Sequence, residues 1–172
     1  TYGEELKWLT TDTTRMTWVA KTIQDITTSG NTLILVDRIS AGEILEKKKK
    51  DAVFVSGSTK NTDRKEQYDE VSTSQNKVII ATYGVAAVGI NIPRIFNLVL
   101  IEPGKSFVRV IQSIGRGIRK AEDKDSVQIW DITSSCKFAK RHLGARKKFY
   151  KEANYPYNIC LLYTSPSPRD RS

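Results

Sequence analysis

The sequence has few of the residues that build disulfide frameworks, metal centres and catalytic dyads. Its 172 residues include two cysteines, one histidine and one methionine. Cys136 and Cys160 are too few for a disulfide framework or a four-ligand zinc site. We therefore predict a protein of the reducing cytoplasm, with no metal ion held by this chain itself.

Long hydrophobic runs are also lacking. No stretch approaches the roughly 18 apolar residues that cross a bilayer, and the amino terminus has no signal-peptide pattern. The chain instead combines 39% apolar with 27% charged residues, as soluble globular proteins do. Its length suits one domain of ordinary size but not two.

Positive charge is spread unevenly along the chain. Residues 1–133 hold 19 Lys and Arg against 17 Asp and Glu, whereas residues 134–160 hold seven against one. A basic stripe beside a nearly neutral body favours a phosphate-backbone partner, through Coulomb attraction and counterion release. The alternative is a merely solvated lysine face.

Short apolar runs alternate with amphipathic segments. The expected strands cover 32–37, 53–56, 78–82, 98–102 and 127–132. The expected helices cover 12–29, 41–50, 63–71, 83–89, 108–119 and 136–154. This alternation predicts an α/β fold: a parallel sheet, built by right-handed crossovers, with helices on both faces.

The last expected helix is amphipathic and basic. Its apolar stripe should contain Phe138, His142, Ala145 and Phe149. The other sides carry the basic residues, and we predict nucleic-acid contacts from Lys140, Arg141, Lys147 and Lys148. A role in packing or solvation is expected for His142, which has no evident base, metal or nucleophile partner.

The two ends of the chain differ from its middle. The chain begins with Thr1, so we expect residues 1–29 to form a leading helix joined to an upstream domain that is missing here. Residues 30–160 would form the domain itself. Residues 161–172 contain Ser-Pro-Ser-Pro and no periodicity, which predicts a disordered tail and is typical of a cloning or sequencing-adapter scar.

Ligand sites of parallel sheets lie beyond the carboxyl ends of the strands, so functional residues are expected in the segments that follow each strand. The helix after strand 98–102 reads QSIGRGIR. Gln112, Arg116 and Arg119 share one helical face there, while Gly115 permits close approach of a partner. Two arginines on one face suit a polyphosphate, because each guanidinium can bind phosphate oxygens bidentately. The alternative is a pair of exposed arginines on a helix that glycine weakens.

The segment after strand 78–82 reads ATYGVAAVGINIP. The Thr82 hydroxyl can donate to a phosphate, and Asn91 can bond to a sugar hydroxyl. Gly89 permits backbone approach. Taken alone, the segment is equally typical of a tight strand-to-helix turn.

In this order and spacing, the two segments resemble motifs V and VI of superfamily 2 helicases, whose second RecA-like domain carries T…G…P followed by QxxGRxxR. The resemblance runs over nearly all of residues 1–160. It implies that Arg116 and Arg119 reach the γ-phosphate of ATP held by a partner domain, one as the arginine finger, with Gln112 and Gly115 beside them.

The resemblance also assigns further contacts. Gly89 and Asn91 would approach the nucleotide ribose, although most relatives have an acidic residue where Asn91 stands. Thr82 would contact the nucleic-acid backbone. The loop containing Arg38 and the turn at Ser56 and Gly57 correspond, on a weaker signal, to other nucleic-acid-contacting segments of the family.

The chain lacks the motifs that would cradle the nucleotide. Gly-Lys-Ser at 104–106 lacks the glycine required five positions earlier, where Val99 stands, and no DExH stretch is present. The resemblance therefore implies ATP with Mg²⁺ held mainly by the missing domain. It implies the C-terminal half of an ATP-dependent helicase that remodels branched DNA or RNA–DNA hybrid in phage recombination, repair or replication, in the cytoplasm of an infected bacterium. A duplex translocase and a non-catalytic nucleic-acid-binding module are the alternatives.

Overall fold

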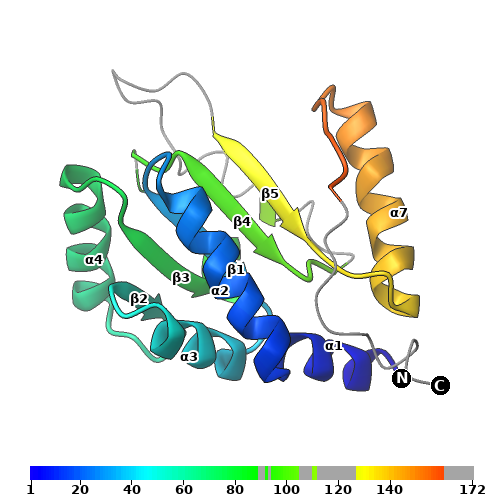
Figure 1. Cartoon of the computed structure of the whole chain (residues 1–172). Helices are drawn as coiled ribbons and strands as arrows, with labels where there is room; N and C mark the ends of the chain where they lie inside the picture. Colours follow the sequence, from blue (N-terminus) through cyan, green and yellow to red (C-terminus); the bar gives the residue numbers. More distant parts are fainter. Residues whose placement is uncertain (89–91, 93, 105–109, 112–126, 161–172) are drawn as a thin grey trace.

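The computed structural model of the chain describes residues 1–88, 92, 94–104, 110–111 and 127–160 (Figure 1). Its centre is a five-stranded parallel sheet in the order β2-β3-β1-β4-β5. The strands are β1 Thr32–Val36, β2 Ala52–Val55, β3 Val78–Thr82, β4 Asn97–Ile101 and β5 Gln128–Ile132. All five expected strands are confirmed, and no boundary differs from the expectation by more than one residue.

Helices connect the strands and flank the chain. They are α1 Tyr2–Thr11, α2 Thr13–Thr27, α3 Ile39–Lys48, α4 Asn61–Thr73, α5 Tyr83–Ala87 and α7 Lys137–Glu152. The sequence predicted a single leading helix, and α1 was missed. Asp12 separates the two helices: its backbone N–H bonds to the carbonyl of Trp8 in α1, and its side chain accepts from the N–H of Arg15 in α2. Of the helix expected at 108–119, the structure describes only Val110 and Ile111, which are helical.

The sheet is covered on both faces, as the alternating pattern predicts. On one face, Ile34 and Val36 of β1 pack in a cluster with Met16 and Ile23 of α2 and with residues of α3. On the other, Leu33 and Leu35 pack with Val71 of α4 and with residues of α5, Val110 and Ile111. No helix among the described residues is long and apolar enough to span a bilayer.

The last helix, α7, flanks β5 at the edge of the sheet (Figure 1). Its buried residues are Ala139, His142, Arg146 and Tyr150. The expected stripe is therefore confirmed only in part: His142 is buried and Phe149 packs half-buried against the core, whereas Phe138 is half-buried and Ala145 is exposed. The stripe is displaced because two polar side chains, Arg146 and Tyr150, find a carboxylate partner on β5.

Candidate functional site at the carboxyl edge of the sheet

The carboxyl ends of the five parallel strands lie at one edge of the sheet, and the chain leaves each strand there. Arg38 follows β1, Ser56 and Gly57 follow β2, and Thr82 ends β3. The structure thus brings to one edge four of the residues that the sequence singles out. Their roles toward a ligand remain predictions.

Thr82 is held in place by the helix that it begins. Its side-chain oxygen accepts a hydrogen bond from the backbone N–H of Val85 at 3.2 Å, so it caps α5. The hydroxyl proton remains able to donate to a phosphate oxygen. Next along the chain, Gly84 is exposed, and a Cβ added there would meet only the Thr82 oxygen at 3.8 Å. This edge is therefore open to close approach.

The other strand-end residues differ in their burial and in their contacts within the fold. Arg38 is half-buried, lies 3.8 Å from the Asp37 carboxylate and donates weakly to the Gly3 carbonyl at 3.4 Å. Ser56 is buried, and its hydroxyl lies 2.9 Å from that of Ser58. Its contacts are those of a turn that holds itself together, whereas the neighbouring Gly57 is exposed with open space around it.

The residues expected to contact the nucleotide lie outside the described residues: Gly89, Asn91, Gln112, Gly115, Arg116 and Arg119. Their described neighbours fix where two of these segments meet the fold. Ile92 is fully buried, and Val110 and Ile111 are buried in the same cluster as Leu98 and Leu100 of β4. Gln112 follows Ile111 directly in the chain.

The basic residues predicted to contact nucleic acid on α7 are accessible. Lys140, Arg141 and Lys148 are exposed and Lys147 is half-buried. The Arg141 guanidinium lies 5.5 Å from the centre of the Phe138 ring, which restrains one of the four. Nothing about their position conflicts with the prediction.

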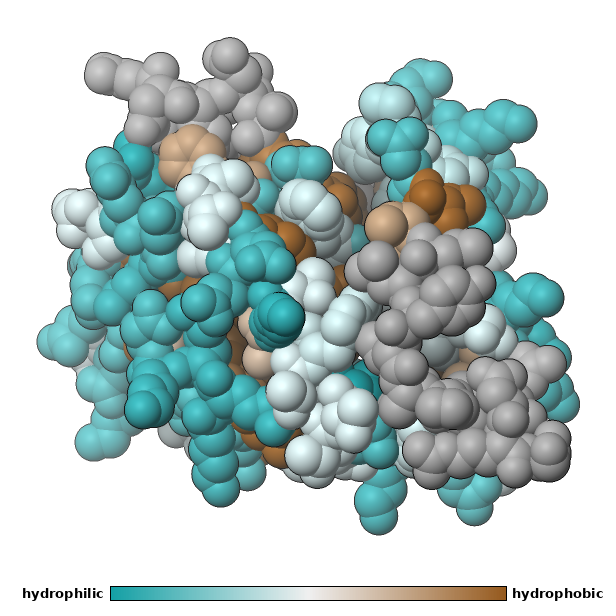
Figure 2. All heavy atoms as spheres, viewed as in Figure 1, coloured by the Kyte–Doolittle hydropathy of each residue, from teal (hydrophilic) through white to brown (hydrophobic). Residues whose placement is uncertain are grey.

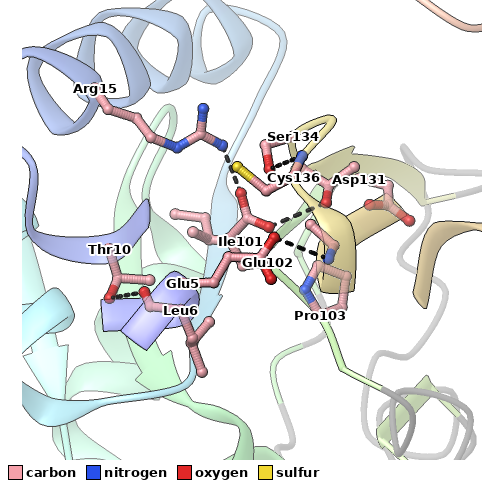
Figure 3. A network of polar contacts seen from close by, with 12 residues as sticks. Glu5, Leu6, Thr10, Arg15, Ile101, Glu102, Pro103, Asp131, Ser134 and Cys136 are labelled. Atoms are coloured by element: carbon pink, nitrogen blue, oxygen red, sulfur yellow. Dashed lines mark hydrogen bonds and ion pairs between the residues drawn. The ribbon is translucent and has the colours of Figure 1, made fainter. Parts of the chain in front are cut away.

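A buried ion pair beneath this edge was missed by sequence reasoning (Figure 3). Arg15 reaches from α2 to the carboxylate of Glu102, directly after β4, and the Thr133 hydroxyl donates to the other carboxylate oxygen at 3.0 Å. Burial raises the pKa of Glu102 above its ordinary value of 4.5, while Arg15 and the hydrogen bond from Thr133 act against that rise. The available signal was a single acidic residue ending an apolar strand.

Glu102 also has an unusual backbone. Its φ is 45°, in the left-handed region that residues other than glycine seldom adopt, at a cost of about 1 kcal/mol. A backbone hydrogen bond of 2.9 Å from its N–H to the Ile132 carbonyl ties it to β5. The chain thus turns sharply where it leaves β4, ahead of the segment that carries the arginine motif.

A second buried network holds α7 against the same turn. Arg146 is fully buried and donates to both carboxylate oxygens of Asp131, at 2.7 and 2.9 Å, and to the Pro103 carbonyl at 2.7 Å. The Tyr150 hydroxyl donates to Asp131 at 2.7 Å, and burial together with that carboxylate raises the pKa of Tyr150. Helical spacing from His142 was the signal that could have placed both side chains inside.

Glu5 joins the two ends of the described chain. Its carboxylate in α1 accepts backbone hydrogen bonds from Phe138 at 2.9 Å and Ala139 at 3.3 Å, in the first turn of α7. The ring of Tyr2 packs edge-on against His142, with centroids 4.9 Å apart. The expected packing role of His142 fits its burial.

Metal ligands do not gather in the part of the chain that the structure describes, where no group of three or more His, Cys, Asp or Glu side chains is placed to hold an ion. The carboxylates Glu102 and Asp131 are taken up by arginines.

The parallel five-stranded sheet with helices on both faces is a RecA-like α/β fold. A family model described as the helicase conserved C-terminal domain matches residues 14–121. The chain therefore belongs to the helicase conserved C-terminal domain family, as the motifs of the sequence led us to expect.

Two curated relatives extend this result. The ATP-dependent DNA helicase uvsW of Enterobacteria phage T4 is 31% identical over 160 residues, which cover 90% of this chain and 32% of the relative. Putative helicase 22 of Sulfolobus islandicus filamentous virus is 33% identical over 104 residues, which cover 58% of this chain and 18% of the relative. The chain thus spans about a third, or less, of the length of these relatives.

Solved structures agree on the fold. The crystal structure of T4 UvsW matches with a TM-score of 0.74 and 22% identity, over 88% of this chain and 35% of that one. The C-terminal part of the Fun30 ATPase domain matches with a TM-score of 0.63 and 14% identity, over 90% and 50%. S. cerevisiae Dbp5 bound to RNA and ADP BeF3 matches with a TM-score of 0.57 and 22% identity, over 78% of this chain and 36% of that one.

Proposed function

We propose that this chain is the C-terminal half of an ATP-dependent helicase that remodels branched DNA or RNA–DNA hybrid. The observation that carries the proposal is the arginine motif QSIGRGIR, which follows β4 inside a chain whose residues 14–121 match the helicase family. We keep the division expected from the sequence, with residues 1–29 leading from an upstream nucleotide-binding lobe into the domain of residues 30–160.

Arg116 and Arg119 are assigned to the triphosphate. Val110 and Ile111 are buried in the core, so the start of the segment that follows them is fixed by packing. ATP with Mg²⁺, held mainly by the upstream lobe, would supply the free energy of hydrolysis. The two guanidinium groups would neutralise charge on the phosphate oxygens, and Gln112, Gly115, Gly89 and Asn91 would lie beside the nucleotide.

The strand-end groups are assigned to nucleic acid. Thr82 offers a hydroxyl proton, and Arg38 and Gly57 lie at neighbouring strand ends of the same edge. Closure of the two lobes would bring the arginines onto the nucleotide. Reopening would shift the nucleic-acid contacts of one lobe relative to those of the other. The relatedness to a phage helicase supports a role in recombination, repair or replication in the cytoplasm of an infected bacterium.

The test uses the chain joined to its upstream lobe. Arg119→Ala should lower nucleic-acid-stimulated ATP hydrolysis by about 10³-fold, as loss of an arginine finger does, with DNA affinity retained. Lys21→Ala is the matched control, because Lys21 is an exposed cation on α2 away from the strand ends. The 172 residues alone should show no ATPase above background. Full ATPase in the Arg119 variant, or nucleic-acid-stimulated ATPase from the chain alone, would overturn the proposal.

Strand displacement by the assembled protein separates a helicase from a duplex translocase. A non-catalytic module, the remaining alternative, would lose DNA binding in the Arg119 variant and have no ATPase to lose.

A further inference from the structure

The cations of α7 are arranged on one side of the helix. Lys137, Lys140, Arg141, Lys147, Lys148 and Lys151 form what we call the cationic face. At 3.6 residues per turn they fall within an arc of about 120°, opposite the buried stripe. None of the six forms an ion pair with any described residue. Figure 2 shows hydrophilic atoms along the outer side of α7, at the right of the view.

Gly144 lies at the centre of that face. A glycine in a helix interior costs about 1 kcal/mol relative to alanine. Packing within the described structure gives no reason for this cost, because a Cβ added at Gly144 would meet nothing within 4 Å. Lys140 and Arg141 lie one turn before it, and Lys147 and Lys148 one turn after. A helix surface without a side chain, flanked by four cations, favours close approach of an anionic backbone.

The length and stiffness of the face indicate which nucleic acid fits. From Lys137 to Lys151 the helix spans about 21 Å, which equals the rise of about six base pairs. Single-strand sites add exposed aromatic rings on which bases stack. Phe138, the ring nearest the face, is half-buried and already lies against Arg141 and Lys137. Tyr155 and Tyr157 are exposed just after α7, but their rings pack against Phe149 and Tyr150, on the side of the helix away from the cationic face. The face itself therefore offers charge without a stacking platform, which suits duplex backbone.

We propose that the cationic face of α7 is a second nucleic-acid site, which holds the phosphate backbone of a double strand without reading its sequence, with Gly144 as the point of closest approach. The proposal rests on the proposed function only in taking nucleic acid as the partner. The α7 helix begins near the carboxyl end of β5 and runs back along the flank of the sheet (Figure 1). Duplex bound there would continue away from the strand-end site.

The test measures binding of the 172-residue chain, without ATP, to a fluorescent 20-base-pair duplex by anisotropy at several salt concentrations. Gly144→Ala should weaken binding about threefold and Gly144→Leu about tenfold. Thermal stability of the alanine variant should rise, because alanine favours the helix. Gly3→Ala is the matched control: Gly3 is an exposed glycine in α1 with nothing within 4 Å of a Cβ, and its change should leave binding unaltered.

Lysine variants give an independent readout. Lys148→Ala should weaken binding about three- to tenfold and reduce the slope of log affinity against log salt by about 1, whereas Lys65→Ala on α4 should change neither. Wild-type affinity in both Gly144 variants, or an unchanged slope in the Lys148 variant, would overturn the proposal. An equal loss of affinity for single strands would overturn the duplex assignment. These outcomes are separate from the ATPase test, since they need neither ATP nor the upstream lobe.

Discussion

Replacement of Arg146 by methionine tests how α7 is held to the sheet. Methionine keeps much of the side-chain volume but removes the three hydrogen bonds of the guanidinium to Asp131 and Pro103. Removing one partner of a buried ion pair costs about 3–5 kcal/mol, because the other charge is left without compensation. Since 15% of the Asp131 side chain is exposed to water, we expect the lower end, about 3 kcal/mol.

Urea unfolding and thermal melting measure this loss. For a chain of this length, about 3 kcal/mol corresponds to a fall in Tm of roughly 6–12 °C. Arg141→Met, on the exposed side of the same helix, should change the free energy of unfolding by less than about 0.5 kcal/mol. Adding Asp131→Asn to Arg146→Met should recover part of the loss, because no unpaired carboxylate then remains. A loss in Arg146→Met as small as that in Arg141→Met would refute the reasoning.

Two further predictions concern the carboxylates of Glu5 and Glu102, near the carboxyl edge of the sheet. Glu5→Ala should lower the free energy of unfolding by about 1–2 kcal/mol, because the Glu5 carboxylate accepts the backbone hydrogen bonds of Phe138 and Ala139 in the first turn of α7. Amide exchange at these two residues should become faster, with a smaller effect for Glu5→Gln. Unchanged exchange would contradict this role of Glu5 at the start of α7. For Glu102, the folded pKa lies above 4.5, so just above that pH the folded chain holds a proton that the unfolded chain has released. This contribution to stability is complete below pH 4.5 and is lost as pH rises through the folded pKa, so Glu102→Gln should flatten the dependence of unfolding on pH in that window.

The sheet could be predicted from the sequence because each strand is a short apolar run bounded by turn residues. Thr32–Val36 is buried at all five positions, which a continuous β-branched and leucine run favours. The same logic places Arg38, Ser56, Gly57 and Thr82 at one edge, since parallel strands share a direction. Helix α1 also carried a signal in the sequence, because Thr1 and Glu4 form a capping box. Its apolar side is short, with Leu6 and Leu9 buried and Trp8 half-buried.

The interior of the site could not be predicted in the same way, because hydropathy ranks charged side chains as exterior. Arg15 and Glu102 are both buried, and each is acceptable inside only because the other is there. They are 87 residues apart in the chain. A pairing over that distance depends on the sheet order and on how α2 lies across β4, which no local pattern contains.

The cations of α7 fall into two groups, one buried and one exposed to a partner. The buried cation of α7 is Arg146, whose planar guanidinium matches the two carboxylate oxygens of Asp131. Five of the six cations outside are lysines, compact charges on flexible stems that follow a phosphate backbone without fixed geometry. Residues 134–160 hold seven Lys and Arg, so subtracting Arg146 leaves six for a partner, against the single acid Glu152. The attraction of α7 for nucleic acid should therefore depend on those six cations, whereas its attachment to the domain depends on Arg146.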